Sequence, residues 1–311
     1  MTYLAASARL YRYAFKLVRR YSFMPACRIF SVVAYYMRFK RLLTESNIKA
    51  VFIANHYSPE CLGLATAAHD GQMKVLLTNH ASGTGETGYV APVYADLAAV
   101  TSQAMADLYR KYSPKGLQII RLPIATPQKP MTIPAVGQRS LVAGIYLTAL
   151  TNETRLRELV AELLKAGNIA TVFIRIHPAD VVNSDLSGIV ANGKPIEISQ
   201  HKPLSEDIER TDLAIVGNSS VTIELLRGGC PVLYDHRLDE IIYDYNGFEG
   251  RGLVLAFPAR LQKKFLDDVE AHYGSQAWIE TMRYFDWGYQ RDEKTMLRDF
   301  KSAVLRTVAP S

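Results

Sequence analysis

The sequence has few cysteines, no long apolar run and no internal repeat. Its three cysteines, Cys27, Cys61 and Cys230, form no CxxC pair, which excludes a disulfide scaffold or a zinc ribbon and fits a reducing compartment. Near the N-terminus the longest stretch without a strongly polar residue, 29–37, has nine residues, whereas a membrane-spanning helix needs about 20. No Asp-x-Asp follows a predicted strand and no His/Cys pair has zinc spacing, so we expect no metal site.

The composition is that of an ordinary globular protein, with 49% hydrophobic and 21% charged residues, which argues against disorder or several membrane spans. At about 150 residues per domain, a chain of 311 residues predicts two compact domains. The net charge of +6 is unevenly distributed, because residues 1–44 carry nine basic side chains and no acidic one. The rest of the chain is therefore mildly acidic, and the basic character belongs to an N-terminal arm.

This arm, residues 1–44, also contains six tyrosines. A basic, aromatic and amphipathic segment is typical of helices that lie on an anionic membrane surface, and Pro25 is expected to divide it into two helices. Two other interpretations stay open: the arm packs against the body with its arginines solvated, or it binds nucleic acid. We favour the membrane and expect no nucleic-acid partner, because no nucleic-acid-binding motif follows.

From residue 49 onward, short apolar runs alternate with helix-length amphipathic runs, the pattern of parallel sheets covered by helices on both faces. The predicted strands are residues 50–54, 73–78, 117–122, 141–148, 170–176, 213–216 and 231–234. The predicted helices are residues 59–68, 95–112, 154–166 and 221–227, and the chain after Pro258 is predicted to be helical to its end.

Residues 123–134 contain four of the fourteen prolines. Because proline fixes φ and removes a backbone donor, this stretch is predicted to be an interdomain linker or a long surface loop. The α/β pattern on both sides predicts two Rossmann-like domains that face each other across a cleft. We assign residues 45–125 and 126–256 to these domains and expect residues 257–311 to form helices that pack back on the cleft.

One motif lies directly after a strand, where ligands of open parallel sheets bind. It reads Phe173-Ile-Arg-Ile-His177-Pro178 and places an imidazole at the predicted mouth of the cleft. The proline prevents the strand from continuing. A capping histidine without function is the alternative, and we favour a ligand contact because of the position at the strand end.

A second motif runs from a strand into Gly217-Asn218-Ser219-Ser220, where a short helix containing Thr222 begins. Either serine can cap that helix. Unpaired backbone N–H groups, the helix dipole and the serine hydroxyls would then form an anion site. Capping and phosphate binding use the same geometry, so the two interpretations are compatible.

Together the two motifs resemble the nucleotide-binding half of bacterial GT-B glycosyltransferases. A strand ends in His177-Pro178, and about forty residues later a strand leads into Asn218-Ser219-Ser220, a helix and Gly229-Cys-Pro231. The likeness covers about residues 140–256 and is greatest to the sialyltransferase, polysialyltransferase and Kdo-transferase families, which use CMP-activated sugars. It implies that His177, Ser219 and Ser220 hold a nucleotide phosphate, with Gly217, Asn218 and Thr222 in the same site. The acidic-acidic-Gly motif that supplies the base in sialyltransferases is absent here.

A second resemblance concerns the segment that follows. It reads Tyr234-Asp235-His-Arg-Leu-Asp239-Glu240-Ile-Ile-Tyr243, with Gly250-Arg251-Gly252 further on, and it is similar to the corresponding segment of CDP-glycerol glycerophosphotransferases. Both resemblances imply a cytidine nucleotide. Nucleotide-sugar 2-epimerases also pair two Rossmann domains with phosphate-binding serines, so an epimerase and a catalytically inactive binding module stay open as alternatives.

The resemblance predicts a glycosyltransferase of bacterial surface polysaccharide or glycolipid assembly, such as capsule or lipopolysaccharide. The expected donor is of the CMP-sialic acid or CMP-Kdo type, and the acceptor is a hydroxyl of a glycan or lipid-linked glycan. The enzyme would need no metal or cofactor, because the helix N-terminus and His177 would balance the leaving-group charge. With its arm, it would be cytoplasmic and peripheral on the inner face of the cytoplasmic membrane.

Transfer to a hydroxyl needs a base, which we expect in the N-terminal, acceptor-binding domain. His56 and Glu60 follow its first predicted strand, and His80 and Glu86 follow its second. Glu153, after the first strand of the other domain, is a fifth candidate. We rank Glu60 first because it follows the first strand so closely, and His80 second. With His177, these two complete the predicted catalytic set.

Overall fold

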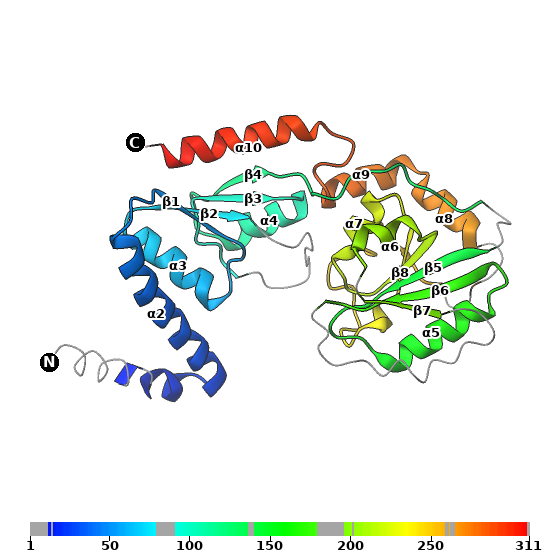
Figure 1. Cartoon of the computed structure of the whole chain (residues 1–311), viewed down its shortest axis with the longest axis horizontal. Helices are drawn as coiled ribbons and strands as arrows, with labels where there is room; N and C mark the ends of the chain where they lie inside the picture. The colour runs from blue at the N-terminus through cyan, green and yellow to red at the C-terminus, as the bar shows by residue number, and fades with distance from the viewer. Residues whose placement is uncertain are drawn as a thin grey trace.

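The computed structural model of the protein describes residues 12–13, 15–78, 91–135, 140–178, 196–200, 202–258, 261 and 265–309. Within these ranges the chain forms two separate sheets, one of four strands and one of six. Figure 1 shows them as two lobes, connected along one side by the chain that follows the first sheet and by the segment leading into the last helix. The predicted α/β class with two Rossmann-like units is confirmed.

The first lobe is built on a sheet in the order β1-β2-β3-β4, and each neighbouring pair is parallel. Its strands are β1 (Ala50–Ile53), β2 (Lys74–Thr78), β3 (Leu97–Val100) and β4 (Gln118–Arg121), and its helices are α2 (Phe23–Thr44), α3 (Pro59–Asp70) and α4 (Gln103–Tyr112). Side chains alternate between the two faces. Val75 and Leu77 pack in the core under α3 and α4, whereas Leu76 faces the opposite side.

The last helix, α10 (Glu293–Val308), covers that opposite side of the first sheet. Ala303 and Val304 pack in one cluster with Leu76 of β2 and Leu97 of β3. The chain therefore returns to the first lobe after it has completed the second, and Figure 1 shows α10 lying along β4.

The second lobe is built on a sheet in the order β10-β9-β8-β5-β6-β7. Its strands are β5 (Leu141–Tyr146), β6 (Ile169–Arg175), β7 (Ile196–Ser199), β8 (Leu213–Val216), β9 (Val232–Tyr234) and β10 (Leu255–Ala256). Its helices are α5 (Glu153–Lys165), α6 (Leu204–Glu209), α7 (Val221–Arg227), α8 (Phe265–Tyr273) and α9 (Gln276–Phe285), with a 3₁₀ turn η2 (His236–Leu238). All its strand pairs are parallel. The order is that of a Rossmann sheet, whose switch point lies between β5 and β8.

The helix predicted over residues 95–112 is confirmed only in its second half, as α4, and is wrong in its first half. Residues Leu97–Val100 form the buried strand β3, and Ser102 then begins α4 by accepting a hydrogen bond from the N–H of Met105 at 3.0 Å. The run Leu-Ala-Ala-Val has the composition of a helix, but it lies between β2 and β4 in the sheet. Tertiary burial decides its conformation against the local preference of alanine.

Pro25 does not divide the arm into two helices. It lies in the first turn of α2, where the backbone N–H that proline lacks would have no partner within the helix. Tyr21 and Ser22 instead separate the helical residues 15–20 from α2. The proline-rich stretch 123–134 has no regular element, as predicted. It lies along the end of α7, because the N–H of Lys129 donates to the carbonyl of Arg227 at 2.9 Å.

Candidate active site

The buried carboxylate of Asp239 organises the switch point of the second sheet. Asp239 is 2% exposed, and burial raises the pKa of its carboxyl. It accepts hydrogen bonds from the Thr148 hydroxyl, after β5, and from the N–H of Asn218, after β8. Gly217 makes this approach possible, because a Cβ at that position would lie 2.7 Å from Cγ of Asp239. One carboxylate thus connects the segments that follow β5, β8 and β9.

The side chain of Asn218 holds the segment beyond Asp239 in place. Its Nδ2 donates to the carbonyls of Ile241 and Tyr243 at 2.9 and 3.0 Å. Its Oδ1 accepts from the Tyr234 hydroxyl at 2.5 Å and from the N–H of Tyr245 at 2.9 Å. With both side-chain atoms bonded in this way, Asn218 positions the loop that follows Asp239.

Several backbone N–H groups in and directly after the serine motif also have partners already. Those of Val221, Thr222 and Ile223 donate to the Ser219 hydroxyl, the Ser219 carbonyl and the Ser220 carbonyl at 3.4, 3.3 and 3.1 Å. Thr222 is fully buried, and its hydroxyl donates to the Ser219 carbonyl at 2.8 Å. The N–H groups of residues 218, 219 and 221–223 therefore have partners within the protein, and the Thr222 hydroxyl is bonded to the helix start. The Ser220 side chain makes no capping bond, so the two serine hydroxyls are the groups this motif offers a ligand.

His177 lies two residues beyond the end of β6 and is partly exposed. Strand β6 pairs with β5, and β5 pairs with β8, so the ends of β6 and β8 are two strand spacings apart, about 10 Å. His177 and Ser219 therefore follow strands that lie on opposite sides of β5.

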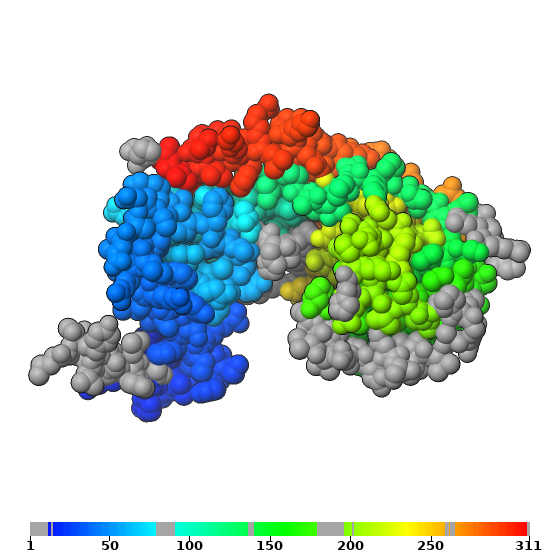
Figure 2. All heavy atoms as spheres, viewed as in Figure 1, coloured from blue at the N-terminus to red at the C-terminus, as the bar shows by residue number. Residues whose placement is uncertain are grey.

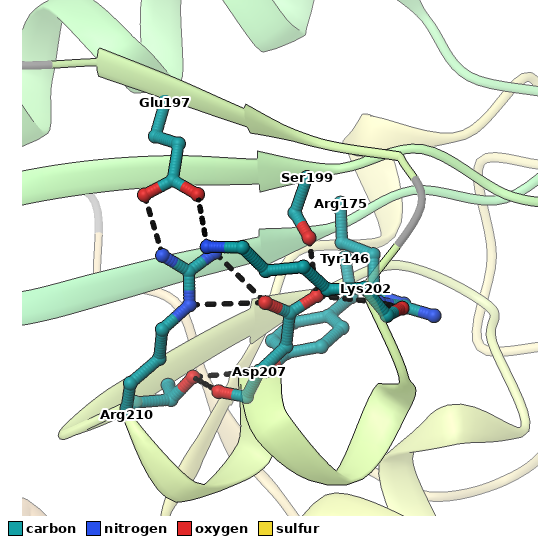
Figure 3. Close-up of polar contacts among 8 residues, drawn as sticks. Tyr146, Arg175, Glu197, Ser199, Lys202, Asp207 and Arg210 are labelled. Carbon is teal, nitrogen blue, oxygen red and sulfur yellow. Dashed lines mark hydrogen bonds and ion pairs between the residues drawn. The ribbon is translucent and has the colours of Figure 1, made fainter.

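A buried ion-pair network fixes the strand end from which His177 projects (Figure 3). Asp207 of α6 is fully buried and accepts from the Ser199 hydroxyl at 2.6 Å, from Nε of Arg210 at 3.0 Å and from Arg175, the last residue of β6. Arg175 also donates to the carbonyl of Lys202 at 2.9 Å. The ends of β6 and β7 are thereby held against α6.

Glu224 is a carboxyl that the sequence interpretation missed. It lies in the first turn of α7, close in sequence to Ser220, and burial raises its pKa. No hydrogen bond or ion pair to another side chain is found for it among the described residues. A carboxyl held in this way can accept hydrogen bonds from ligand hydroxyls. The acidic residue on a short helix after a serine pair was the available signal.

In the first lobe, His56 and Glu60 follow β1 in very different environments. His56 is 7% exposed, its Nδ1 lies 3.4 Å from the Tyr109 hydroxyl, and burial lowers its pKa. Glu60 is exposed in the first turn of α3. Hydrogen bonds from its own N–H and from Ser58 lower its pKa, which makes it a weaker proton acceptor than an ordinary carboxylate.

Three further candidates for the base were predicted from the sequence. His80 and Glu86 lie outside the described residues. Glu153 is the exposed first residue of α5 in the second lobe. Across the ranges that the structure describes, no group of three or more His, Cys, Asp or Glu side chains is placed to hold a metal ion.

The two sets of strand ends face the space between the lobes. In Figure 1 the chain enters β5 from the side away from the first lobe, and β4 runs toward the second lobe, so their carboxyl ends point toward each other. Figure 2 shows a hollow between the lobes, open on the side where the arm lies. Two Rossmann-like lobes facing across a cleft, with a last helix that returns to the first lobe, define a GT-B-like fold.

Solved structures with the same fold include transferases and an epimerase. A glycosyltransferase from Rickettsia africae has a TM-score of 0.53 and 11% identity, over 90% of this chain and 82% of that one. The Methanocaldococcus jannaschii UDP-GlcNAc 2-epimerase in complex with UDP-GlcNAc and UDP has a TM-score of 0.53 and 12% identity, over 88% and 80%. The pneumococcal O-GlcNAc transferase GtfA in complex with UDP and GlcNAc has a TM-score of 0.51 and 11% identity, over 88% of this chain.

These likenesses are to the fold alone. This chain spans only 60% of the length of the pneumococcal transferase. No protein-family model matches the sequence, and no curated protein matches it.

Proposed function

We propose that the protein is a glycosyltransferase that takes its sugar from a pyrimidine-nucleotide-activated donor. The observation that carries this proposal is that His177 and the pair Ser219-Ser220 follow the strands on either side of β5, in a Rossmann-type sheet that faces a second one. Ligands of such sheets bind at this position. Serine hydroxyls and an imidazole are donors suited to phosphate oxygens.

The motifs support a cytidine donor of the CMP-sialic acid or CMP-Kdo type, and a CDP-glycerol-type transfer is the variant of this proposal. Two solved structures of the same fold are complexes with UDP, so uridine nucleotides are the comparison. The experiment is a thermal-shift titration with CMP, CDP, UDP and GDP. Ligand at about 100 times its Kd stabilises the fold by about 2.7 kcal/mol. A preference for GDP would contradict the proposal, and a sugar nucleotide converted without any acceptor would identify an epimerase instead.

The contacts to phosphate are tested by Ser219→Ala and Ser220→Ala, each with the nucleotide that binds best. Loss of a hydrogen bond to a charged group costs about 1.5–3 kcal/mol, so affinity should fall at least tenfold in each variant. Asn152→Ala is the matched control, because Asn152 caps the neighbouring helix α5 without lying in the serine motif. An equal loss in the control would contradict the assignment of the serines as phosphate contacts.

We propose that the first lobe supplies the base, with Glu60 and His80 as the residues to test. Glu60 is accessible at the carboxyl edge of the first sheet, although its pKa is low. Glu60→Gln should abolish sugar transfer while nucleotide affinity stays unchanged, because only the acceptor needs the base. Normal turnover of this variant would move the role to His80, with His80→Gln as the next test.

We propose that the arm places the enzyme on an anionic membrane surface. The far end of α2 and the residues before it expose large apolar side chains, with Phe23 67% and Met24 74% exposed. The exposed basic side chains Arg12, Lys16, Arg19 and Arg20 lie in the same stretch. Among the described residues, every helix is too short or too polar to reach across the apolar layer of a bilayer. The arm lies on the side of the molecule to which the hollow opens (Figure 2), so a lipid-linked acceptor on that surface would reach it.

Vesicle co-sedimentation tests this placement. Each basic residue near an anionic surface contributes about 1 kcal/mol, so replacing Arg12, Lys16, Arg19 and Arg20 by glutamate should abolish binding to phosphatidylserine vesicles. The control replaces Arg298, Lys301 and Arg306, exposed basic residues of α10, by glutamate. Binding should weaken as salt rises. Equal binding of both variants would leave α2 as a helix that only packs on α3.

A further inference from the structure

Three arginines from three elements gather where the first lobe meets the C-terminal crossing. Arg121 is the last residue of β4, Arg110 lies at the end of α4, and Arg291 follows the turn after α9. The guanidinium of Arg121 lies 4.3 Å from the ring centroid of Trp287. All three arginines are exposed.

Trp287 fixes this arrangement at the carboxyl edge of the first sheet. It is 5% exposed and packs in the core of the first lobe. Its backbone N–H donates to the carbonyl of Thr101 at 2.8 Å. Thr101 follows β3 directly, and the register pairs Val100 of β3 with Arg121 of β4. The turn that carries Arg291 is closed by a hydrogen bond from its N–H to Gly288 at 3.1 Å. The cluster is therefore built on two strand ends and one tight turn.

The carboxylates of this region pair with Arg110 or with groups outside the cluster. Asp107 pairs with Arg110 at 3.1 Å. Asp286 and Glu293 both pair with the buried Arg227. Asp292 caps α10, where it accepts from the N–H of Lys294 at 3.0 Å and from the Thr295 hydroxyl at 2.6 Å.

Two guanidinium groups are left without a carboxylate. Neither Arg121 nor Arg291 forms an ion pair within the described ranges. The charge of Arg291 acts on Asp286 without a salt bridge between the two side chains. Burial, and the positive charges of Arg291 and Arg110, lower the pKa of Arg121. The hydroxyl of Thr101 at the same edge is buried and has no hydrogen-bond partner.

We propose that Arg121 and Arg291 bind an oxyanion of the phosphate type, and that this anion belongs to the acceptor. Planar guanidinium groups bind phosphate oxygens in pairs of hydrogen bonds, and the Trp287 ring holds one of them in place. The site lies on the lobe opposite Ser219 and Ser220, at a strand end that faces the same space, so a group bound here is separate from the donor phosphate. The assignment to an acceptor rests on the proposed glycosyltransferase function, whereas anion binding itself does not.

The test titrates inorganic phosphate into the full chain and follows binding by calorimetry. Arg121→Gln and Arg291→Gln should each weaken phosphate binding about tenfold or more. Arg306→Gln removes the same charge from an exposed position on α10 and should change the affinity less than about twofold. Equal losses in all three variants, or no phosphate binding to the wild-type chain, would overturn the proposal.

Two further arms separate this site from the nucleotide site and identify the source of the anion. Ser219→Ala should leave the Arg121-dependent phosphate binding unchanged, and nucleotide affinity should be the same in Arg121→Gln as in the wild type. Glucose 1-phosphate should displace inorganic phosphate, because an acceptor brings its phosphate on a larger group; failure to displace it would overturn the acceptor assignment. If no nucleotide binds but phosphate binding still depends on Arg121, the proposed function fails and the anion site stands.

Discussion

Replacing Gly217 by alanine should disrupt the switch point of the second sheet. The added Cβ would lie 2.7 Å from Cγ of Asp239, well inside van der Waals contact. Gly217 does not have a positive φ, so the backbone itself accepts alanine and only the contact matters. Asp239 is buried and cannot move away without losing its hydrogen bonds to Thr148 and Asn218.

The loss can be estimated from these two hydrogen bonds. Each bond to a charged group contributes about 1.5–3 kcal/mol, so Gly217→Ala should lower the free energy of unfolding by about 3–6 kcal/mol. For a domain of 150–250 residues this corresponds to a Tm lower by roughly 6–24 °C. Urea unfolding measures the free energy directly. Nucleotide affinity should fall as well, because Ser219 and Ser220 follow Gly217 immediately.

Two variants control for other causes. In Gly167→Ala the added Cβ would meet no atom within 4 Å, and Gly167 has no positive φ. The stability of this variant should stay within about 0.5 kcal/mol of wild type. In Gly217→Ala/Asp239→Ala the carboxylate is absent, and the double variant should be no less stable than Asp239→Ala alone. Additive losses in the double variant, or a Gly217→Ala loss as small as that of Gly167→Ala, would refute the reasoning.

Two other substitutions test the packing around the site. Arg227→Met leaves Asp286 buried without its cation and should lower the free energy of unfolding by about 3–5 kcal/mol. Burial already raises the pKa of Asp286, so the folded variant holds a proton that the unfolded chain releases. The loss of stability measured by urea unfolding should therefore grow from pH 4 to pH 8. A constant loss across that range would contradict this account. Gly63→Ala should separate α2 from α3, because its Cβ would lie 2.6 Å from Cβ of Tyr35; the expected cost is about 1–3 kcal/mol, with Gly167→Ala as the control.

The parts of the fold that could be predicted are those in which burial shows in the local sequence. Strand β8 and helix α7 lie where the apolar run and the amphipathic run predicted them. Strand β3 could not be predicted, because its alanines favour a helix and only its neighbours in the sheet make it a strand. Strand β10 was missed because two residues carry no periodicity.

The candidate site divides in the same way. The rule that ligands bind at strand ends located the serine motif and His177 from the sequence. It could not show that the Asn218 N–H is already bonded, because that group donates to a carboxylate 21 residues further along the chain. The structure adds supporting roles for Asn218 and Thr222, whose side chains form hydrogen bonds within the protein.

The features that sequence reasoning missed are polar contacts between residues distant in the chain. The Thr148 hydroxyl and Asp239 are 91 residues apart, and Arg227 and the Thr126 carbonyl are 101 apart. A buried carboxylate or guanidinium is costly unless its partners are in place, so each such group requires that particular segments meet. Asp239 requires this of three strand ends at the switch point, and Arg227 requires it of the proline-rich linker and the C-terminal crossing. The geometry of the cleft thus depends on a few charged side chains that local hydrophobic patterns do not reveal. A pattern shows which face of an element is buried, but not which distant residue pairs with a charged side chain on that face.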